Sequence, residues 1–423
     1  MDITSAEVQD PWGGDEKLDI KGIAPFNIEH TEPTQKNKFA PWHKPRKQWI
    51  RDRQWGATVS ALIDKLELSN SGRSLNYLSL PGVDLLDIRA LEEIFTEKKV
   101  KLKFLGLNYI DESDSEQNAE QNLSLNEVRS LDFVEQESVV IPEQFEKISE
   151  EDSIASDRVL RKHQSFDVVN IDLCASFADK KPGGAQGTLY AAIYKLLKHQ
   201  AFYRTEDWVF FITSRADKKK VEFSALRKLL DKALNTVNEE VARSYIEGKS
   251  NISLDMLKSD DLSADSLSTL QHRFCFLSSF GIWKSDALLN GEGKSKSIMK
   301  EVLGYHVEST DSVADMVSMA FWCSRLPLVA ADDSGLSTAK INPNAPSPEA
   351  VHLEQAKRAF ERSLNCKDLD LYLSENPADY QVALERSRSL LKKARYAIDE
   401  YEPWLEKQNE RIQALLHADM QDR

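Results

Sequence analysis

Two charged side chains stand at the ends of apolar segments that have the length and composition of buried strands. Asp172 closes the run "FDVVNID", and Arg215 closes the run "WVFFITSR". If both runs are parallel strands, their carboxyl ends meet at the sheet edge where open α/β proteins bind ligands. A carboxylate there can act as a general base, and a guanidinium can bind phosphate or carboxylate through two hydrogen bonds. We therefore take Asp172 and Arg215 as candidate catalytic residues.

Each of these two residues also has a purely structural interpretation. Asp172 could cap the backbone N–H groups at the start of the next helix. Arg215 could form an ion pair with Asp172 or Asp217 and leave no donor for a ligand. The sequence alone does not decide between these alternatives.

A second chemically distinctive segment is "KNKFAPWHKPRKQWIRDRQW", residues 36–55, which holds seven Lys or Arg, one acid and four aromatic residues. Basic and aromatic side chains together suit phosphate contacts and base stacking. The candidate nucleic-acid contacts are Lys44, Arg46, Lys47, Trp49 and Arg51. The alternative is that Phe39, Trp42 and Trp49 anchor this segment on the rest of the protein while the charges face water.

The elements that must position these residues follow from the hydrophobic pattern. Apolar runs typical of strands alternate with amphipathic, helix-like runs, which predicts an α/β fold with a Rossmann-like, mostly parallel sheet and helices on both faces. The expected strands are 75–80, 100–108, 138–142, 166–177 and 207–215, with weaker candidates at 273–280 and 316–324. The expected helices are 45–66, 83–95, 124–131, 188–200 and 223–237, and Ser124 is the expected N-cap of the third.

The chain divides into four expected regions. They are an extended leader (1–38), the Rossmann-like domain (39–330), a Pro- and Ser-rich linker (331–347) and a C-terminal helical hairpin or bundle (348–423). Two helices of a hairpin bury only one stripe each, so the remaining apolar faces need either the sheet domain or a second protein. The flexible linker favours a protein partner or a homo-oligomer.

Composition restricts the class of protein further. The formal net charge of −14 restricts any nucleic-acid contact to a local basic patch. The 423 residues contain no apolar run near the roughly 20 residues of a membrane span, and residues 1–20 lack the features of a secretion signal. These observations predict a cytoplasmic protein without membrane contact. The histidines and cysteines show no metal-ligand spacing, so we expect no metal.

The alternation of strands and helices over residues 45–330 resembles the class I methyltransferase fold. The resemblance implies that S-adenosylmethionine would lie at the ends of the first strands, near "LPGVD" and "LNYID". It implies the cofactor-binding residues Gly82, Asp84, Asn108 and Asp111. The stretches "FAPWHKPRKQW" and "LPGVDLLDIR" are also similar to a group of bacterial methyltransferase-like proteins, a resemblance that implies a link to phage defence.

The residues depart from the methyltransferase pattern at two places that matter for the cofactor. Only Gly82 stands where several glycines usually let the backbone approach the ligand, and Asn108 replaces the usual acid. The leading hypothesis is a degenerate methyltransferase-like protein that works as a binding or scaffold subunit of a bacterial complex, with antiviral defence as its setting. The alternatives are an active S-adenosylmethionine-dependent methyltransferase acting on nucleic acid or a small molecule, and a nucleic-acid-binding adaptor.

Overall fold

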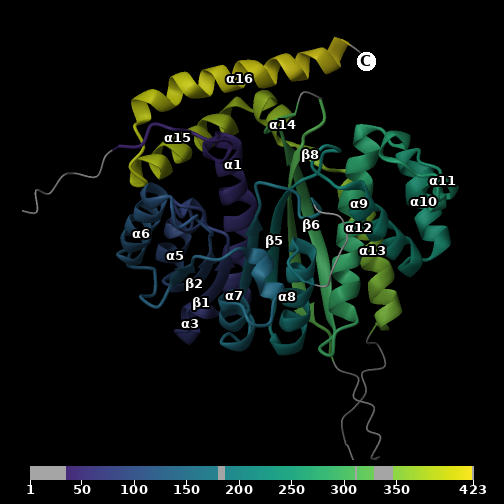
Figure 1. Ribbon diagram of the computed structural model, residues 1–423, viewed down its shortest axis with the longest axis horizontal. Helices are drawn as coiled ribbons and strands as arrows, with labels where there is room; N and C mark the ends of the chain where they lie inside the picture. The colour runs from purple at the N-terminus through teal and green to yellow at the C-terminus, as the bar shows by residue number, and fades with distance from the viewer. Residues whose placement is uncertain (1–34, 180–185, 310–311, 328–345, 422–423) are drawn as a thin grey trace, which may run out of the picture.

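A single eight-stranded sheet organises the molecule in the computed structural model, which describes residues 35–179, 186–309, 312–327 and 346–421 (Figure 1). The expected leader and linker lie largely outside the described residues. The strand order is β3-β2-β1-β4-β5-β7-β6-β8. The strands are β1 (Leu75–Ser79), β2 (Leu102–Leu107), β3 (Val139–Ile141), β4 (Val168–Asp172), β5 (Trp208–Arg215), β6 (Ser295–Tyr305), β7 (Met316–Arg325) and β8 (Lys367–Asp368).

The first five strands are parallel, and β7 runs antiparallel to both β5 and β6. The order reverses between β1 and β4, which defines a topological switch point at the carboxyl ends of these strands. This arrangement confirms the predicted Rossmann-like fold with a mostly parallel sheet. It also brings the loops after β1, β2, β4 and β5 to one edge.

Helices cover both faces of the sheet because each central strand is apolar on both sides. In β5, Phe210 and Ile212 join one core, while Val209 and Phe211 join the other. The first core is closed by α8 (Leu189–Tyr203), α9 (Phe223–Thr236), α12 (Thr269–Leu289) and α13 (Pro348–Leu364). The second is closed by α2 (Ala57–Lys65), α4 (Leu86–Arg89), α5 (Glu92–Lys98), α6 (Ser115–Arg129) and α14 (Leu369–Glu375).

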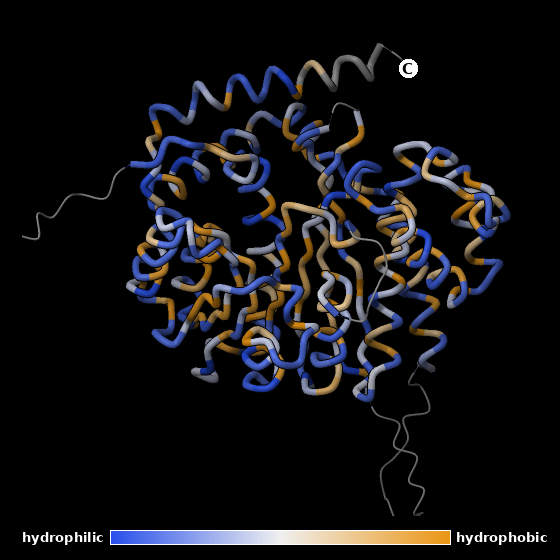
Figure 2. Tube along the Cα trace, viewed as in Figure 1, coloured by the Kyte–Doolittle hydropathy of each residue, from blue (hydrophilic) through white to orange (hydrophobic). Residues whose placement is uncertain are grey.

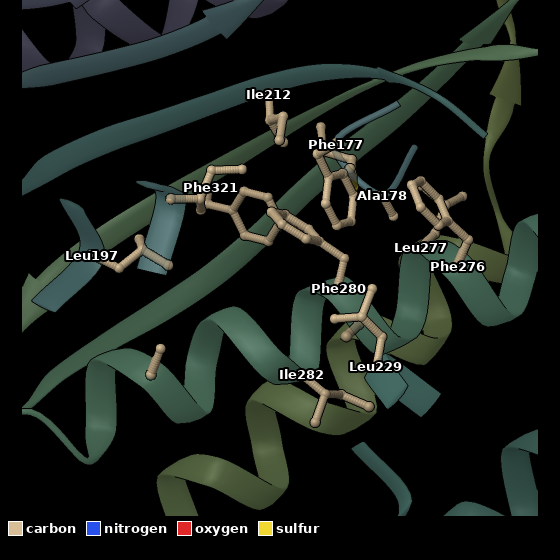
Figure 3. Packing of buried hydrophobic residues seen from close by; sticks show 14 of the residues in the cluster. Phe177, Ala178, Leu197, Ile212, Leu229, Phe276, Leu277, Phe280, Ile282 and Phe321 are labelled. Atoms are coloured by element: carbon tan, nitrogen blue, oxygen red, sulfur yellow. The ribbon is translucent and has the colours of Figure 1, made fainter. Parts of the chain in front are cut away.

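Aromatic packing anchors the segment that follows β4. The Phe177 ring lies 4.8 Å from Phe276 and 4.7 Å from Phe280, and Phe280 lies 6.0 Å from Phe321 on β7 (Figure 3). All four side chains are fully buried. Burying one such side chain is worth about 1.5–3 kcal/mol, so this cluster fixes the chain just beyond Asp172.

The N-terminal helix runs without a break from Pro45 to Lys65 but changes its hydrogen-bonding pattern. A short 3-10 turn, η2 (Pro41–His43), precedes it and is separated from it by the extended Lys44. The helix begins as α1 (Pro45–Trp49), widens into the π-helix η3 (Ile50–Gly56) and returns to the α form in α2. Pro45 occupies the first turn of α1, where its missing N–H costs little. The predicted helix 45–66 is therefore present, with a π-helical insertion that the sequence did not reveal.

The C-terminal residues contribute to the sheet domain. Ser347 caps α13, which packs on α12, and β8 adds the eighth strand beside β6. Further along, α15 (Pro377–Lys393) and α16 (Ile398–Gln421) pack on Leu86 and Phe39, with α16 crossing the top of the view in Figure 1. A C-terminal helical region is present, and the chain itself buries Leu384, Leu391 and Leu405 of its helices, whereas Leu371 and Val382 are exposed.

Several local predictions were wrong, for identifiable reasons. Residues 273–280 lie inside α12, which is buried almost all round, so its apolar run imitated a strand. The helix expected at 124–131 begins at Ser115, Asp114 caps it, and Ser124 is buried in its interior. The run 83–95 breaks into α4 and α5, with Leu85 in a left-handed conformation.

The remaining helical segments complete the described chain. They are α3 (Leu68–Ser71), η4 (Phe145–Ser149), α7 (Ile154–Ser156), η5 (Asp157–Arg161), α10 (Glu239–Ser250), α11 (Leu254–Lys258) and η6 (Ala264–Ser266). In Figure 2 hydrophobic positions follow the strands in the interior, whereas the outer turns and much of α16 are hydrophilic. Within the described part of the chain, every helix falls short of the length and apolar content needed to cross a membrane.

Candidate functional site at the carboxyl edge of the sheet

A pocket of about 420 Å³ opens at the topological switch point. Its walls come from the loops after β1, β2, β4 and β5, from the N-terminal helix and from the end of β6. The predicted residues Gly82, Asp84, Asn108, Asp172 and Arg215 all line it. Asp111 does not line the pocket, because it is exposed on the following loop and accepts hydrogen bonds from Ser113.

The loop after β1 is shaped by Gly82, whose φ of +61° lies in the region that glycine tolerates best. Two residues later, the Asp84 carboxylate accepts hydrogen bonds from Lys36 Nζ at 2.5 Å and from Tyr396 Oη at 2.7 Å. Tyr396 belongs to the C-terminal region, and Lys36 forms a parallel bridge with it. Asp84 therefore binds Lys36, near the start of the described chain, and Tyr396, just before α16, at the rim of the pocket.

Asn108 follows β2, where the resemblance implies a ribose-binding acid. Its Nδ2 donates to Gln121 Oε1 at 2.7 Å, which leaves the side-chain oxygen for the pocket. An amide oxygen can accept a hydrogen bond from a hydroxyl group, but it lacks the charge of a carboxylate.

Asp172 lies at the tip of β4, and an ammonium group from the N-terminal helix reaches it. Lys47 Nζ is 2.5 Å from Asp172 Oδ1 and 4.5 Å from the centre of the Trp55 ring. The Lys47 side chain is almost fully buried, and that burial lowers its pKa against the opposing effect of Asp172. The carboxylate is thus engaged by a cation inside the pocket, and the structure does not form an Asp172–Arg215 pair.

Arg215 is surrounded by acids. Its guanidinium contacts Asp217 at 2.9 Å, Asp315 at 2.9 Å and Glu308 at 3.0 Å. Of the two ion pairs considered from the sequence, the structure therefore forms the one with Asp217. With three carboxylates in contact, Arg215 is poorly placed to bind an anionic ligand as well.

The basic-aromatic segment is turned inward, which corrects both sequence interpretations of its charges. The side chains expected on a nucleic-acid surface or facing water are buried, namely Lys44, Arg46, Lys47 and Arg51, with Trp49 half-buried. Arg46 pairs with Asp370 at 2.6 Å, and Trp49 packs edge-on against Tyr372. The inward arrangement arises because the helix packs between the sheet and the C-terminal helices, where Asp172 on β4 pairs with Lys47 and Asp370 on α14 pairs with Arg46.

Two charged side chains that line the pocket each have one atom without a hydrogen-bond partner among the described residues. Arg51, 5 % exposed, donates from Nη1 to the Trp42 carbonyl at 3.1 Å, while its Nε has no acceptor. Asp87, 6 % exposed, accepts from Ser79 with Oδ2, while its Oδ1 has no donor. Burial raises the pKa of Asp87 to about 6.

Unsatisfied buried polar atoms are costly, so their presence in a pocket points to a ligand. Sequence reasoning did not single out Asp87. The sequence feature that could have indicated it is an acidic residue placed among the apolar residues Leu85, Leu86 and Ile88.

The fold and this pocket define a Rossmann-like α/β protein with a ligand-sized pocket at its topological switch point. More particularly, a family model described as PP_RS20740-like matches residues 36–406, and the chain belongs to that family. The search of curated proteins finds no match.

Three of the solved structures to which the chain is similar are described as methyltransferases. A proposed sarcosine dimethylglycine methyltransferase from Galdieria sulphuraria is 14 % identical, with 66 % of this chain and 87 % of that chain covered and a TM-score of 0.26. The O-methyltransferase of a trans-AT PKS multienzyme of Brevibacillus brevis, in complex with S-adenosyl-L-homocysteine, is 7 % identical, with coverages of 86 % and 94 % and a TM-score of 0.29. A loganic acid methyltransferase with SAH is 10 % identical, with coverages of 69 % and 98 % and a TM-score of 0.26. At these identities and TM-scores none of them assigns an activity to this chain.

Proposed function

We propose that this protein is a degenerate methyltransferase-like protein that binds a small ligand at the switch point without transferring a methyl group. The observation that carries the proposal is the 2.5 Å contact between Lys47 Nζ and Asp172 Oδ1. Asp172 occupies the position at the end of β4 where the resemblance implies the catalytic motif. The Lys47 ammonium occupies an oxygen of this carboxylate, so Asp172 is poorly placed to receive a proton from a substrate as a general base would.

The pocket nevertheless keeps features that favour binding. Its volume lies within the roughly 300–1,000 Å³ typical of ligand sites. The unpartnered Arg51 Nε and Asp87 Oδ1 carry opposite formal charges and both residues line the pocket. This pair of groups fits a ligand that has both a carboxylate and an ammonium.

S-adenosylmethionine has such an amino-acid end, and it is the ligand that we propose for the pocket. Arg51 would hold its carboxylate and Asp87 its ammonium, while Asn108 would face a hydroxyl. When bound, this cofactor supplies an electrophilic methyl group. The single glycine at Gly82 and the amide at Asn108 predict weaker binding than in an active enzyme.

Calorimetric titration with S-adenosylmethionine and S-adenosylhomocysteine tests this proposal. We expect saturable binding of both that is lost in Arg51→Gln, together with no methyl transfer to added nucleic acids or small-molecule pools. A matched control is Lys393→Gln, which removes one exposed cation on α15. Absence of binding by the unmodified protein would contradict the ligand assignment, and methyl transfer by the unmodified protein would show an active enzyme instead.

The role as a subunit of a bacterial complex, including a complex for antiviral defence, rests on the sequence resemblance alone. The nucleic-acid adaptor has lost the exposed basic surface on which it depended. The complex is tested by co-purification of the full-length chain from its native cells. Recovery of the chain alone, under conditions that preserve weak assemblies, would argue against a scaffold.

A further inference from the structure

A second cavity, of about 230 Å³, lies on the opposite side of the N-terminal helix from the switch-point pocket. It is enclosed by α1, α14, α15 and α16. Its polar lining consists of Lys44, Arg46, Asp370, Ser374, Tyr380 and Asn409. Apolar walls are provided by Pro45, Leu373, Pro377 and Ile412. None of these residues lines the first pocket.

Arg46 lines this cavity and has donors without an acceptor in the described chain. The residue is 3 % exposed, and its Nη1 donates to Asp370 Oδ1 at 2.6 Å. Its Nε and Nη2 have no acceptor among the described residues. These two nitrogens form one side edge of the guanidinium, and such an edge binds both oxygens of a carboxylate or phosphate in parallel.

Lys44 adds a second cation to the same cavity. Its Nζ donates to the neutral Gln408 Oε1 at 2.9 Å, and within the described chain no carboxylate lies at ion-pair distance. Burial, together with the nearby charge of Arg46, lowers the pKa of Lys44 to about 7. The other charges that act on it are Asp370 on α14, Arg411 on α16 and Asp315 before β7.

The acids nearby do not compensate both cations. Asp370 Oδ2 accepts from the backbone N–H of His306 at 2.7 Å and lies 3.0 Å from His306 Nδ1, while Oδ1 accepts from Arg46. His306, Asp368 and Asp370 lie close enough together to resemble a metal-ligand set, but the oxygens of Asp370 are already engaged in this ion-pair network. Lys44 and Arg46 therefore leave an excess of positive charge facing the cavity.

We propose that this cavity binds a small oxyanion, a free or esterified phosphate or a carboxylate, between the free edge of Arg46 and the Lys44 ammonium. The Tyr380 hydroxyl accepts from Asn409 Nδ2 at 2.8 Å, so its own hydrogen is available as a further donor. The apolar walls leave room for a small organic group attached to the anion. The site is independent of the function proposed for the switch-point pocket.

Titration of the full-length protein with inorganic phosphate, methyl phosphate and acetate at constant ionic strength tests the site. Calorimetry and thermal unfolding should show saturable binding of at least one anion, and the preferred anion distinguishes free phosphate, a phosphate ester and a carboxylate. Arg46→Lys keeps a cation for Asp370 but loses the side edge, and Lys44→Gln removes the second cation. Each should weaken binding about tenfold or more, as expected for a lost hydrogen bond to a charged group.

Matched variants separate this site from other cationic positions. Lys393→Gln and Arg51→Gln should bind the anion as tightly as the unmodified protein does. Tyr380→Phe removes a single hydroxyl and should weaken binding a few-fold, which provides a test even if Arg46→Lys fails to fold. The proposal is overturned if no anion binds saturably, if Lys44→Gln and Tyr380→Phe bind unchanged, or if Arg51→Gln abolishes the signal.

Discussion

The two sides of the N-terminal helix use the same residue types with different charge balance. On the side of the switch-point pocket, Lys47 and Arg51 face Asp87 and Asp172. On the other side, Asp370 is the one carboxylate among the described residues that line the second cavity, and it pairs with Arg46 while Lys44 lacks an acidic partner there. The comparison teaches that two surfaces with the same number of cations can differ in their balance of acids, and this difference is why we propose a zwitterion for one side and an anion for the other.

The largest effect on stability is expected from deleting the C-terminal residues that line the second cavity. Deleting residues 366–423 takes away β8 and the buried Leu369, Leu373 and Leu391. We expect a chain that exposes its core and aggregates or binds a hydrophobic dye, as judged by near-UV circular dichroism and gel filtration. A soluble, cooperatively unfolding truncated protein would show that the C-terminal side is a separate unit, as the sequence had suggested.

Lys47→Met should destabilise the protein by about 3 kcal/mol, because it leaves Asp172 partly buried without its cation. The double variant Lys47→Met with Asp172→Asn should recover much of this loss, since no unpaired charge remains. Urea unfolding measures both. Equal losses in the single and double variants would mean that packing of the lysine stem, and not the ion pair, holds the helix.

Acid should lower the free energy of unfolding of the protein through His43. This side chain is 2 % exposed and accepts the Ala40 N–H at Nδ1. Burial lowers its pKa from 6.5 to about 3, so the unfolded state takes up a proton first. The contribution of neutral His43 to the free energy of unfolding is complete above pH 6.5. It is lost as pH falls toward 3, by about 1.4 kcal/mol per pH unit.

The matched variant for this prediction is His43→Asn, which can still accept the Ala40 N–H but does not titrate. Its unfolding free energy should depend less steeply on pH between 6.5 and 4. A residual slope from His272, whose pKa burial lowers to about 4, should remain. Identical slopes in the variant and the unmodified protein would contradict the assignment.

The smallest effect on stability is expected for Arg51→Gln, less than about 1 kcal/mol, because its Nε already lacks a partner. This contrasts with Lys47 on the same side of the helix, whose loss breaks an ion pair. Urea unfolding of the two variants side by side makes the comparison. A loss for Arg51→Gln as large as that for Lys47→Met would mean that the guanidinium is structural.

The parallel half of the sheet was predictable because its strands are short, apolar on both faces and separated by regular helices. β6 was not, since lysines and a glutamate interrupt its apolar positions. α12 was mistaken for a strand because a helix buried all round loses the periodicity that identifies it.

The site was predictable only where topology alone decides position. The ends of β1, β2, β4 and β5 meet at one edge, so Gly82, Asn108, Asp172 and Arg215 share a pocket. Asp217 could be named as a partner of Arg215 because it lies two residues away. Lys47 and Glu308 could not be named as partners, because they are distant in sequence and reach the pocket only through tertiary packing.

The π-helical turn at Ile50–Gly56 has a consequence for the rotation of everything before it. A π-turn holds one residue more than an α-turn, so η3 takes up its additional residue within one wide turn and leaves residues 45–49 in the rotation that a regular helix would give them. In that rotation Lys47 reaches Asp172 and Arg46 reaches Asp370. A single-residue deletion inside η3 would close the wide turn and keep both ion pairs, whereas a deletion at Gln48 in α1 would turn both cations by about 100° around the helix axis, away from their acids.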